Sequence, residues 1–195
     1  MRISQTEKLK LRERILTEAL SSLKLKGANG VSVDELMRNL GLTSGALYSH
    51  FKSKNDLFQQ VVQKELDRLI AHHQSQIERL GVRALADFVD SYLVDGHIDS
   101  IQRGCIFAAL GADLQRQKPN VRKKFGAKMQ DLFETMASGS VQLSPTVRLA
   151  KVHFVFSSLV GSLVLARSLQ NSKMQSQILN TAKNQLLNFI QKEWR

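Results

Sequence analysis

SVDELMRNLGLTSGALYSHFKSKND, residues 32–56, predicts two short helices joined by a tight turn and followed by the start of a third. Ser32 is a favourable N-cap, and Glu35 stands three residues later in the capping-box position. Gly41 supplies the backbone freedom that ends the first helix. Thr43 can then cap the second helix. The stretch therefore predicts a helix-turn-helix unit.

The second helix of this unit has an outward face of small, hydrogen-bonding side chains. Leu47 and Phe51 lie four residues apart and can share one buried face. A helix without bulky outward side chains can approach base edges and phosphates in a major groove. We therefore expect a DNA-reading face made by Thr43, Ser44, Gly45, Tyr48 and Ser49, with His50 at its rim.

These residues resemble the TetR family of bacterial transcriptional regulators. The likeness lies in the runs Ser32–Leu36, Gly41–Phe51 and Lys52–Leu57, and upstream in Arg14–Leu16 with Ala19. The Tyr-x-His-Phe-x-x-Lys run, Tyr48 to Lys54, is the most specific part. The resemblance is strong only over roughly the first third of the chain. Asn29-Gly30 and Asn55 depart mildly from the family pattern.

The resemblance implies an all-α fold of about nine helices. It consists of an N-terminal three-helix DNA-binding domain, which we place at residues 1–53, and a larger ligand-binding and dimerisation domain at residues 54–195. The family pattern also implies that Lys54 holds a DNA phosphate, and we expect Tyr48 to do the same. In such regulators a small molecule shifts the spacing of the two reading helices and releases DNA.

Composition agrees with a helical nucleic-acid-binding protein. The chain has 195 residues and two prolines, and 28 Lys and Arg face 17 Asp and Glu, which gives a net charge of +11. Such a charge favours an acidic partner, either nucleic acid or an anionic membrane surface. Helical periodicity predicts further helices at about 5–26, 53–80, 82–95, 104–118, 119–137, 144–170 and 172–194.

The sequence predicts a cytoplasmic protein without a membrane partner. The N-terminus is polar and basic, and a single cysteine excludes an intramolecular disulfide framework. Residues 150–166 are the most apolar stretch, yet Lys151, His153 and three serines interrupt it. We expect this stretch to be too short to span a membrane and to be buried in protein.

The last two predicted helices indicate a homodimer. Residues 149–165 are apolar around almost the whole helix, and such a helix must be covered on all sides. We therefore expect these helices to pair with their copies in a four-helix bundle, with Gly161 and Ser162 at a close crossing. The alternative is a monomeric helical core. After Thr135 the chain has seven basic residues and one acidic residue. Because two such surfaces would repel each other in a dimer, we expect these basic side chains to point to the rim of the interface.

A ligand cavity is expected between the DNA-binding unit and this bundle. Its candidate lining residues are Phe88, Tyr92, Phe107, Met129, Phe133, Met136, Phe154 and His153. Cys105 is a candidate sensor, because it follows Arg103-Gly104 at the start of a helix, where a thiolate is favoured. Its Gly-Cys-Ile surroundings resemble an electrophile-sensing branch of the family. For all these residues the alternative role is plain core packing.

Other classes of protein find less support. His72 and His73 are adjacent and point to different sides of a helix, and neither a carboxylate-rich metal spacing nor a glycine-rich phosphate loop occurs. We therefore expect no enzyme activity, metal or cofactor. A basic helical protein on a membrane surface has one candidate helix, residues 5–26.

We expect a sequence-specific transcriptional repressor that an unknown small-molecule or electrophile inducer releases from a pseudo-palindromic double-stranded DNA operator. The alternative is a basic helical protein that binds nucleic acid without sequence preference, with an affinity set by salt.

Overall fold

The computed structural model describes residues 4–194, and every regular element in that range is a helix. The all-α prediction is therefore confirmed for this range. The elements are α1 (Gln5–Gly30), α2 (Val33–Asn39), α3 (Ser44–Tyr48), α4 (Lys54–Leu80), the 3-10 turn η1 (Gly81–Arg83), α5 (Ala84–Tyr92), α6 (Gly96–Asp99), α7 (Ile106–Gln115), α8 (Pro119–Ala137), α9 (Pro145–Arg167) and α10 (Ser172–Glu193).

Ser32 and Gly41 act at the helix-turn-helix as the sequence predicts, whereas the capping bond expected from the Thr43 side chain does not form. The Ser32 hydroxyl accepts a hydrogen bond from the Glu35 amide at 3.4 Å, which satisfies a free donor at the start of α2. Gly41 adopts φ = 72°, a left-handed conformation that reverses the chain before α3. Leu47 and Phe51 are both buried in the core that α3 shares with α1 and α2. Gly45 and Tyr48 of α3 are thereby left exposed, while Ala46 packs partly against this core.

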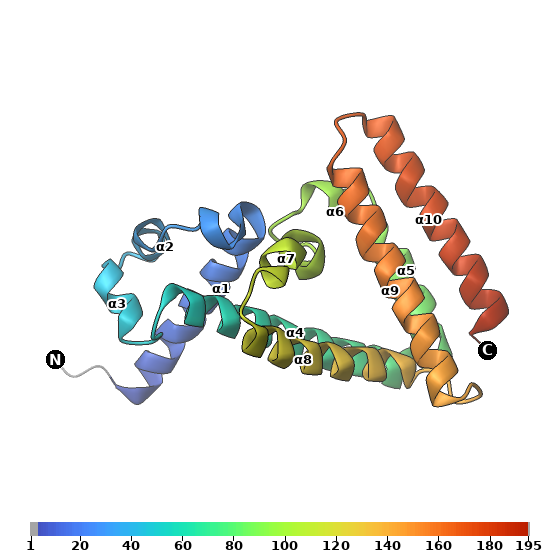
Figure 1. Cartoon of the computed structure of the whole chain (residues 1–195), viewed down its shortest axis with the longest axis horizontal. Coiled ribbons are helices and arrows are strands. Elements are labelled where there is room, and N and C mark those ends of the chain that lie inside the picture. Colours follow the sequence, from blue (N-terminus) through green and yellow to red (C-terminus); the bar gives the residue numbers. More distant parts are fainter. Residues whose placement is uncertain (1–3, 195) are drawn as a thin grey trace.

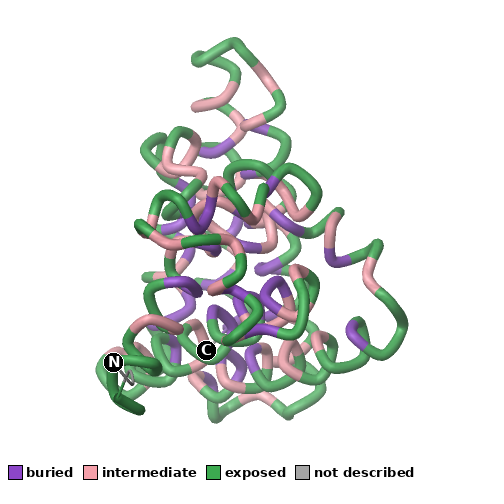
Figure 2. Tube along the Cα trace, turned by 90° about the vertical axis from the view of Figure 1, so that its left-hand side faces the viewer, coloured by how far each residue is buried: buried purple, intermediate pink, exposed green. Residues whose placement is uncertain are grey.

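The N-terminal unit and the α9–α10 pair lie at opposite ends of the molecule (Figure 1). α4 runs from the unit towards the lower end of α9, and α8 packs along it. α7 lies between the two ends and contacts both α1 and α9. Buried residues follow the inward sides of the helices, as the purple segments of Figure 2 show. α4 and α7 are thus the physical connections between the two ends.

Two interruptions and one short helix were not expected. Gly27 has φ = 70° inside α1, so the helical backbone is interrupted one residue after the expected end at residue 26. The helix expected over 82–95 ends at Tyr92, because Leu93 leaves the helical conformation while its side chain stays buried. α6 follows as a separate four-residue helix that the sequence analysis did not predict.

α9 is longer than the apolar stretch that predicted it. Its 23 residues are long and apolar enough to cross a membrane by length and composition, so the expectation that this segment is too short was wrong. Its contacts, however, are with α6, α7, α8 and α10. Six of its side chains are buried among these helices, whereas Phe154, Val164 and Leu165 are 45–53% exposed.

A buried ion pair joins α1 to α4. Lys24 Nζ lies 3.0 Å from Glu65 Oε1, and the two side chains are only 3% and 4% exposed. Arg68 donates two further hydrogen bonds to the same carboxylate, at 2.7 and 3.1 Å. Burial alone would raise the pKa of Glu65, but Arg68 and Lys24 hold it below its ordinary value. The carboxylate therefore stays charged and fully bonded inside the protein.

We predict that Lys24→Met lowers the free energy of unfolding by about 3 kcal/mol, because it leaves a buried carboxylate with one cation fewer. The double variant Lys24→Met, Glu65→Leu should recover part of this loss, since no buried charge then remains. Urea denaturation followed by circular dichroism measures both values.

Lys128→Met is the matched control, because it removes an exposed lysine whose Nζ lies 2.6 Å from Asp67. It should change stability little, as expected for surface ion pairs. Equal losses in the control and in Lys24→Met would contradict the role assigned to the buried pair.

Candidate DNA-binding surface and ligand cavity

α3 presents a small, open face to solvent. Thr43, Gly45, Tyr48 and Ser49 are exposed, and the Tyr48 side chain is 58% exposed. Nothing lies within 4 Å of the position that a Cβ would take at Gly45. The backbone of α3 can therefore come close to another surface at this point.

Two hydroxyls of the predicted DNA-binding set are already bonded within the unit. Ser44 is half-buried and donates a hydrogen bond to the Asp34 carboxylate of α2, and Ser49 donates to the Ala46 carbonyl at 2.8 Å. The Thr43 hydroxyl makes no capping bond to α3. Of the three hydroxyls, Thr43 is thus the one not engaged in holding the unit together.

Lys54 is the first residue of α4, beside the end of α3. Ser53 caps this helix by accepting a bond from the Asp56 amide at 3.0 Å, and the Lys52 amide donates to Asp56 at 2.8 Å. Within residues 4–194, Lys54 makes no ion pair. A lysine without an acidic partner at a helix N-terminus suits a phosphate, which the helix dipole also favours.

A small basic notch adjoins the rim of this face. It measures about 250 Å³ and is lined by Gln5, Lys8, Leu9, Arg12, Ser49 and His50. Burial, with added repulsion from Lys8 and Arg12, lowers the pKa of His50. The Arg12 guanidinium lies 5.3 Å from the centre of the Phe51 ring, so it also packs on the core. Sequence reasoning noted the basic start of α1 but did not single out Lys8.

Four of the nine predicted ligand-binding residues come together in one cavity. Phe88, Tyr92, Cys105 and Phe107 line a space of about 140 Å³ at the junction of α4, α5 and α7. The remaining walls come from several elements: Glu65, Arg68, Leu69, His73, His97, Arg103, Gly104, Ile106, Leu132 and Phe156. Sequence reasoning named Arg103 and Gly104 only as neighbours that favour a Cys105 thiolate, and no local signal marked Arg68.

The other predicted lining residues lie elsewhere. Phe154 is 50% exposed on α9 and packs edge-on against Phe189 of α10, because it occupies the outward side of its helix. Phe133 packs on His153 and Phe156, with ring centres 4.8 and 5.2 Å away. Met129 and Met136 pack in the core outside this cavity, so these residues belong to the helix packing around it.

His97 fixes the loop that carries Cys105. The Cys105 amide donates to His97 Nε2 at 3.1 Å, so His97 Nδ1 carries the proton and donates to the Tyr92 carbonyl at 2.8 Å. Burial lowers the pKa of His97, which favours this neutral ring. Arg167 of α9 donates to the His97 carbonyl at 2.7 Å. Three elements are thereby tied to His97, two of them through its imidazole and the third through its carbonyl.

Gly104 is required by this arrangement. A Cβ there would lie 2.6 Å from Arg167 Nη2, and 2.9 Å from both His97 Nε2 and the Ser100 carbonyl oxygen. Cys105, directly after it, is half-buried at the N-cap of α7. The thiol therefore faces the cavity from a position that the loop determines.

His73 and Tyr92 are buried polar groups in the cavity wall. The His73 ring meets the Phe88 ring edge-on, with centres 4.6 Å apart. Burial, with a smaller contribution from His72, lowers the pKa of His73 to about 4. Burial also raises the pKa of Tyr92 far above its ordinary value. Both groups are therefore uncharged at neutral pH. No group of three or more potential metal ligands occurs within residues 4–194.

Comparison with known proteins identifies the N-terminal unit. Residues 15–61 match the family model described as bacterial regulatory proteins, tetR family. Residues 15–61 are thus a TetR-family domain. Over 61 residues the chain is 38% identical to HTH-type transcriptional regulators of Staphylococcus aureus, strains USA300 and N315. That segment covers 31% of this chain and 33% of those relatives, so the match concerns the DNA-binding part.

Solved structures extend the likeness to the whole TetR-family fold. A TetR transcriptional regulator from Legionella pneumophila is 20% identical, with a TM-score of 0.75 and complete coverage of both chains. Reduced NemR of Escherichia coli is 15% identical, with a TM-score of 0.73 over 92% of this chain and 96% of NemR. FadR of Bacillus subtilis, solved with stearoyl-CoA, is 14% identical, with a TM-score of 0.68 over 91% and 96%. At these identities the likeness concerns the fold.

We predict that His73 makes the folded chain less stable in acid. Its folded pKa of about 4 lies below the ordinary 6.5, so the unfolded chain takes up a proton first as pH falls. Stability is full above pH 6.5 and decreases down to pH 4, by about 3 kcal/mol in total at 1.36 kcal/mol for each pKa unit.

His73→Leu should flatten this dependence, and the difference isolates His73 because His50 and His97 remain in both proteins. Denaturation at pH 8, 6 and 5 and at one protein concentration measures it, with pH 8 reporting the packing cost alone. Parallel pH profiles for the two proteins would refute the assignment.

Proposed function

We propose that the chain is a sequence-specific transcriptional repressor that leaves a pseudo-palindromic operator when a small molecule occupies the cavity at Cys105. The observation that carries this proposal is the open outer face of α3 within a TetR-family domain. The proposed DNA contacts are the predicted ones, Thr43, Ser44, Gly45, Tyr48, Ser49, His50 and Lys54, to which we add Lys8. Such a function belongs in the cytoplasm.

The packing of α7 supports a link between cavity and DNA. α7 begins next to Cys105 and packs along α1. Asp113 of α7 approaches Gly27 so closely that a Cβ there would lie 3.2 Å from its carboxylate. A ligand that displaces the start of α7 must therefore also displace the end of α1, which holds α2 and α3. This packing supports the division into a DNA-binding domain, residues 1–53, and a domain that binds the ligand, residues 54–195.

The outer side of α9 supports a homodimer through α9 and α10. Phe154, Val164 and Leu165 are 45–53% exposed, an apolar stripe that a second copy can cover. Nothing lies within 4 Å of a Cβ position at Gly161, so two such helices can cross closely there. The basic residues do not oppose this contact: Lys151 and Lys183 pair with Glu193 and Asp90 of the same chain.

The first test is selection of bound duplexes from a random DNA library by the purified protein at physiological salt. We expect an enriched inverted repeat, because two copies of α3 read two half-sites. Absence of enrichment, with binding that disappears as salt rises, would instead support a nonspecific nucleic-acid-binding protein.

Lys54→Ala should weaken binding to the selected operator and to unrelated DNA alike, since a phosphate contact carries no sequence information. The slope of log affinity against log salt should fall by about one for each protomer. Lys192→Ala, which removes the same charge at the far end of α10, is the matched control and should leave the slope unchanged. A loss confined to one operator sequence would contradict the phosphate role.

Gly161→Gln should raise the dimer dissociation constant at least about tenfold, because its side chain occupies the helix crossing. Gly126→Gln is the control, since Gly126 is also a helical glycine with open space around its Cβ position. Both changes improve helix propensity, so the fold of each chain is retained. Sedimentation velocity at several concentrations measures the constant, and an unchanged dimer in Gly161→Gln would rule out this interface.

A further inference from the structure

The ligand cavity adjoins a larger surface groove. The groove measures about 710 Å³ and lies between α1, α4 and the loop before α7, and the cavity measures about 140 Å³. Glu65, Arg68 and Arg103 line both spaces. A ligand can therefore have one end in the cavity and the other at these three side chains.

Positive charge is in excess at this junction. Lys24, Arg68 and Arg103 stand against the single carboxylate of Glu65, and Lys64, the remaining cation of the groove, pairs with Glu13. Arg103 is exposed and makes no ion pair within residues 4–194. The Arg68 side chain is 62% exposed although it bonds Glu65. Two guanidinium groups are thus accessible to an anion, and guanidinium binds carboxylate well.

The interior of the cavity is aromatic and of the size of one ring. Phe156 lies between Phe88 and Phe107, with ring centres 6.5 and 5.2 Å away. The volume of about 140 Å³ is close to the cavity of about 150 Å³ that holds benzene in another protein. The Tyr92 hydroxyl in this wall is buried, lies near the Cys105 thiol, and makes no hydrogen bond of good geometry within residues 4–194. A ligand that bonds this hydroxyl would satisfy it.

We propose that the inducer is a small aromatic carboxylate whose ring lies among Phe88, Phe107 and Phe156 and whose carboxylate binds Arg68 and Arg103. The binding site stands on the two spaces and their charges, and only its role as an inducer rests on the function proposed above.

This geometry gives the ligand a route to the DNA-binding unit. A carboxylate at Arg68 competes with Glu65, which now receives both hydrogen bonds from Arg68. Glu65 also holds Lys24 of α1. The ligand therefore changes the contact that fixes α1 on α4, and it does so without touching the DNA-binding face.

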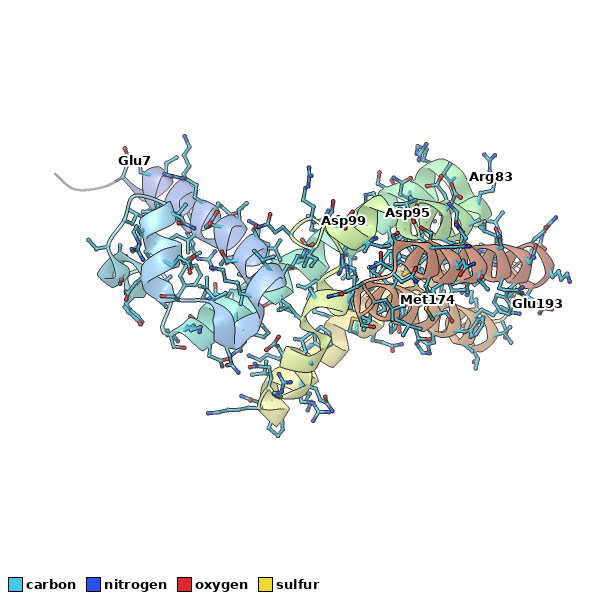
Figure 3. All side chains as sticks on the ribbon, turned by 90° about the horizontal axis from the view of Figure 1, so that it is seen from above. Glu7, Arg83, Asp95, Asp99, Met174 and Glu193 are labelled. Atoms are coloured by element: carbon cyan, nitrogen blue, oxygen red, sulfur yellow. The ribbon has the colours of Figure 1, made fainter. Side chains whose placement is uncertain are left out.

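Calorimetric titration of the full chain with benzoate, in the absence of DNA, tests the site. We expect saturable binding of benzoate, and binding of the uncharged analogue benzamide at least about tenfold weaker. Arg103→Gln should weaken benzoate binding by a similar factor. Arg83→Gln, an exposed arginine at the opposite end of the molecule from Glu7 (Figure 3), should not. Equal affinity for benzamide, unchanged binding by Arg103→Gln, or no binding at millimolar benzoate would overturn the proposal.

Operator release tests the role of the ligand. Benzoate should lower the affinity for the selected operator at least about tenfold in the unmodified chain and in Arg83→Gln, but not in Arg103→Gln, because Arg68 and Arg103 hold the ligand. An equal response in Arg103→Gln, or benzoate binding that leaves the operator affinity unchanged, would overturn the proposed role. Failure to find any operator would refute the proposed function but leave the calorimetric result standing.

Discussion

The Lys24–Glu65 ion pair is the contact on which the joining of α1 to α4 depends. A buried charge is tolerated only when it is paired and bonded, so a change in the position of one helix on the other that separates these side chains is costly. α1 in turn carries α2 and α3 through the core at Leu36, Leu47 and Phe51. The orientation of the DNA-binding face is therefore set by a polar contact some distance behind it.

The same carboxylate stands at the mouth of the cavity. In the proposed function, ligand binding must be connected to the position of α3. Glu65 can provide this connection, because it lines the cavity and also pairs with Lys24 of α1. Interactions of this kind are discrete: Glu65 either keeps both hydrogen bonds from Arg68 or shares that guanidinium with another anion. A small change at the groove can thus have a defined effect on α1.

Sequence reasoning succeeded where the determinants are local. Ser32, Gly41 and Ser53 act through the next few residues, so the helix boundaries of the N-terminal unit followed from them. It failed where the determinants come from distant elements. Phe154 is apolar but faces outward, which periodicity could not reveal in a helix that is apolar all round. Arg68 and Arg103 meet only because the loop before α7 folds back on α4.

Gly104 limits which mutations the wall of this cavity can accept during evolution. Three polar atoms already occupy the space that any side chain would need, so every point mutation at this codon that alters the amino acid disturbs the loop at once. Arg103 and Leu69, by contrast, line the cavity from less crowded positions. Homologues with different inducers should therefore share a glycine at this position and differ at those two. The backbone of the loop at Gly104 should therefore stay the same, and differences in ligand preference should come from the side chains at Arg103 and Leu69.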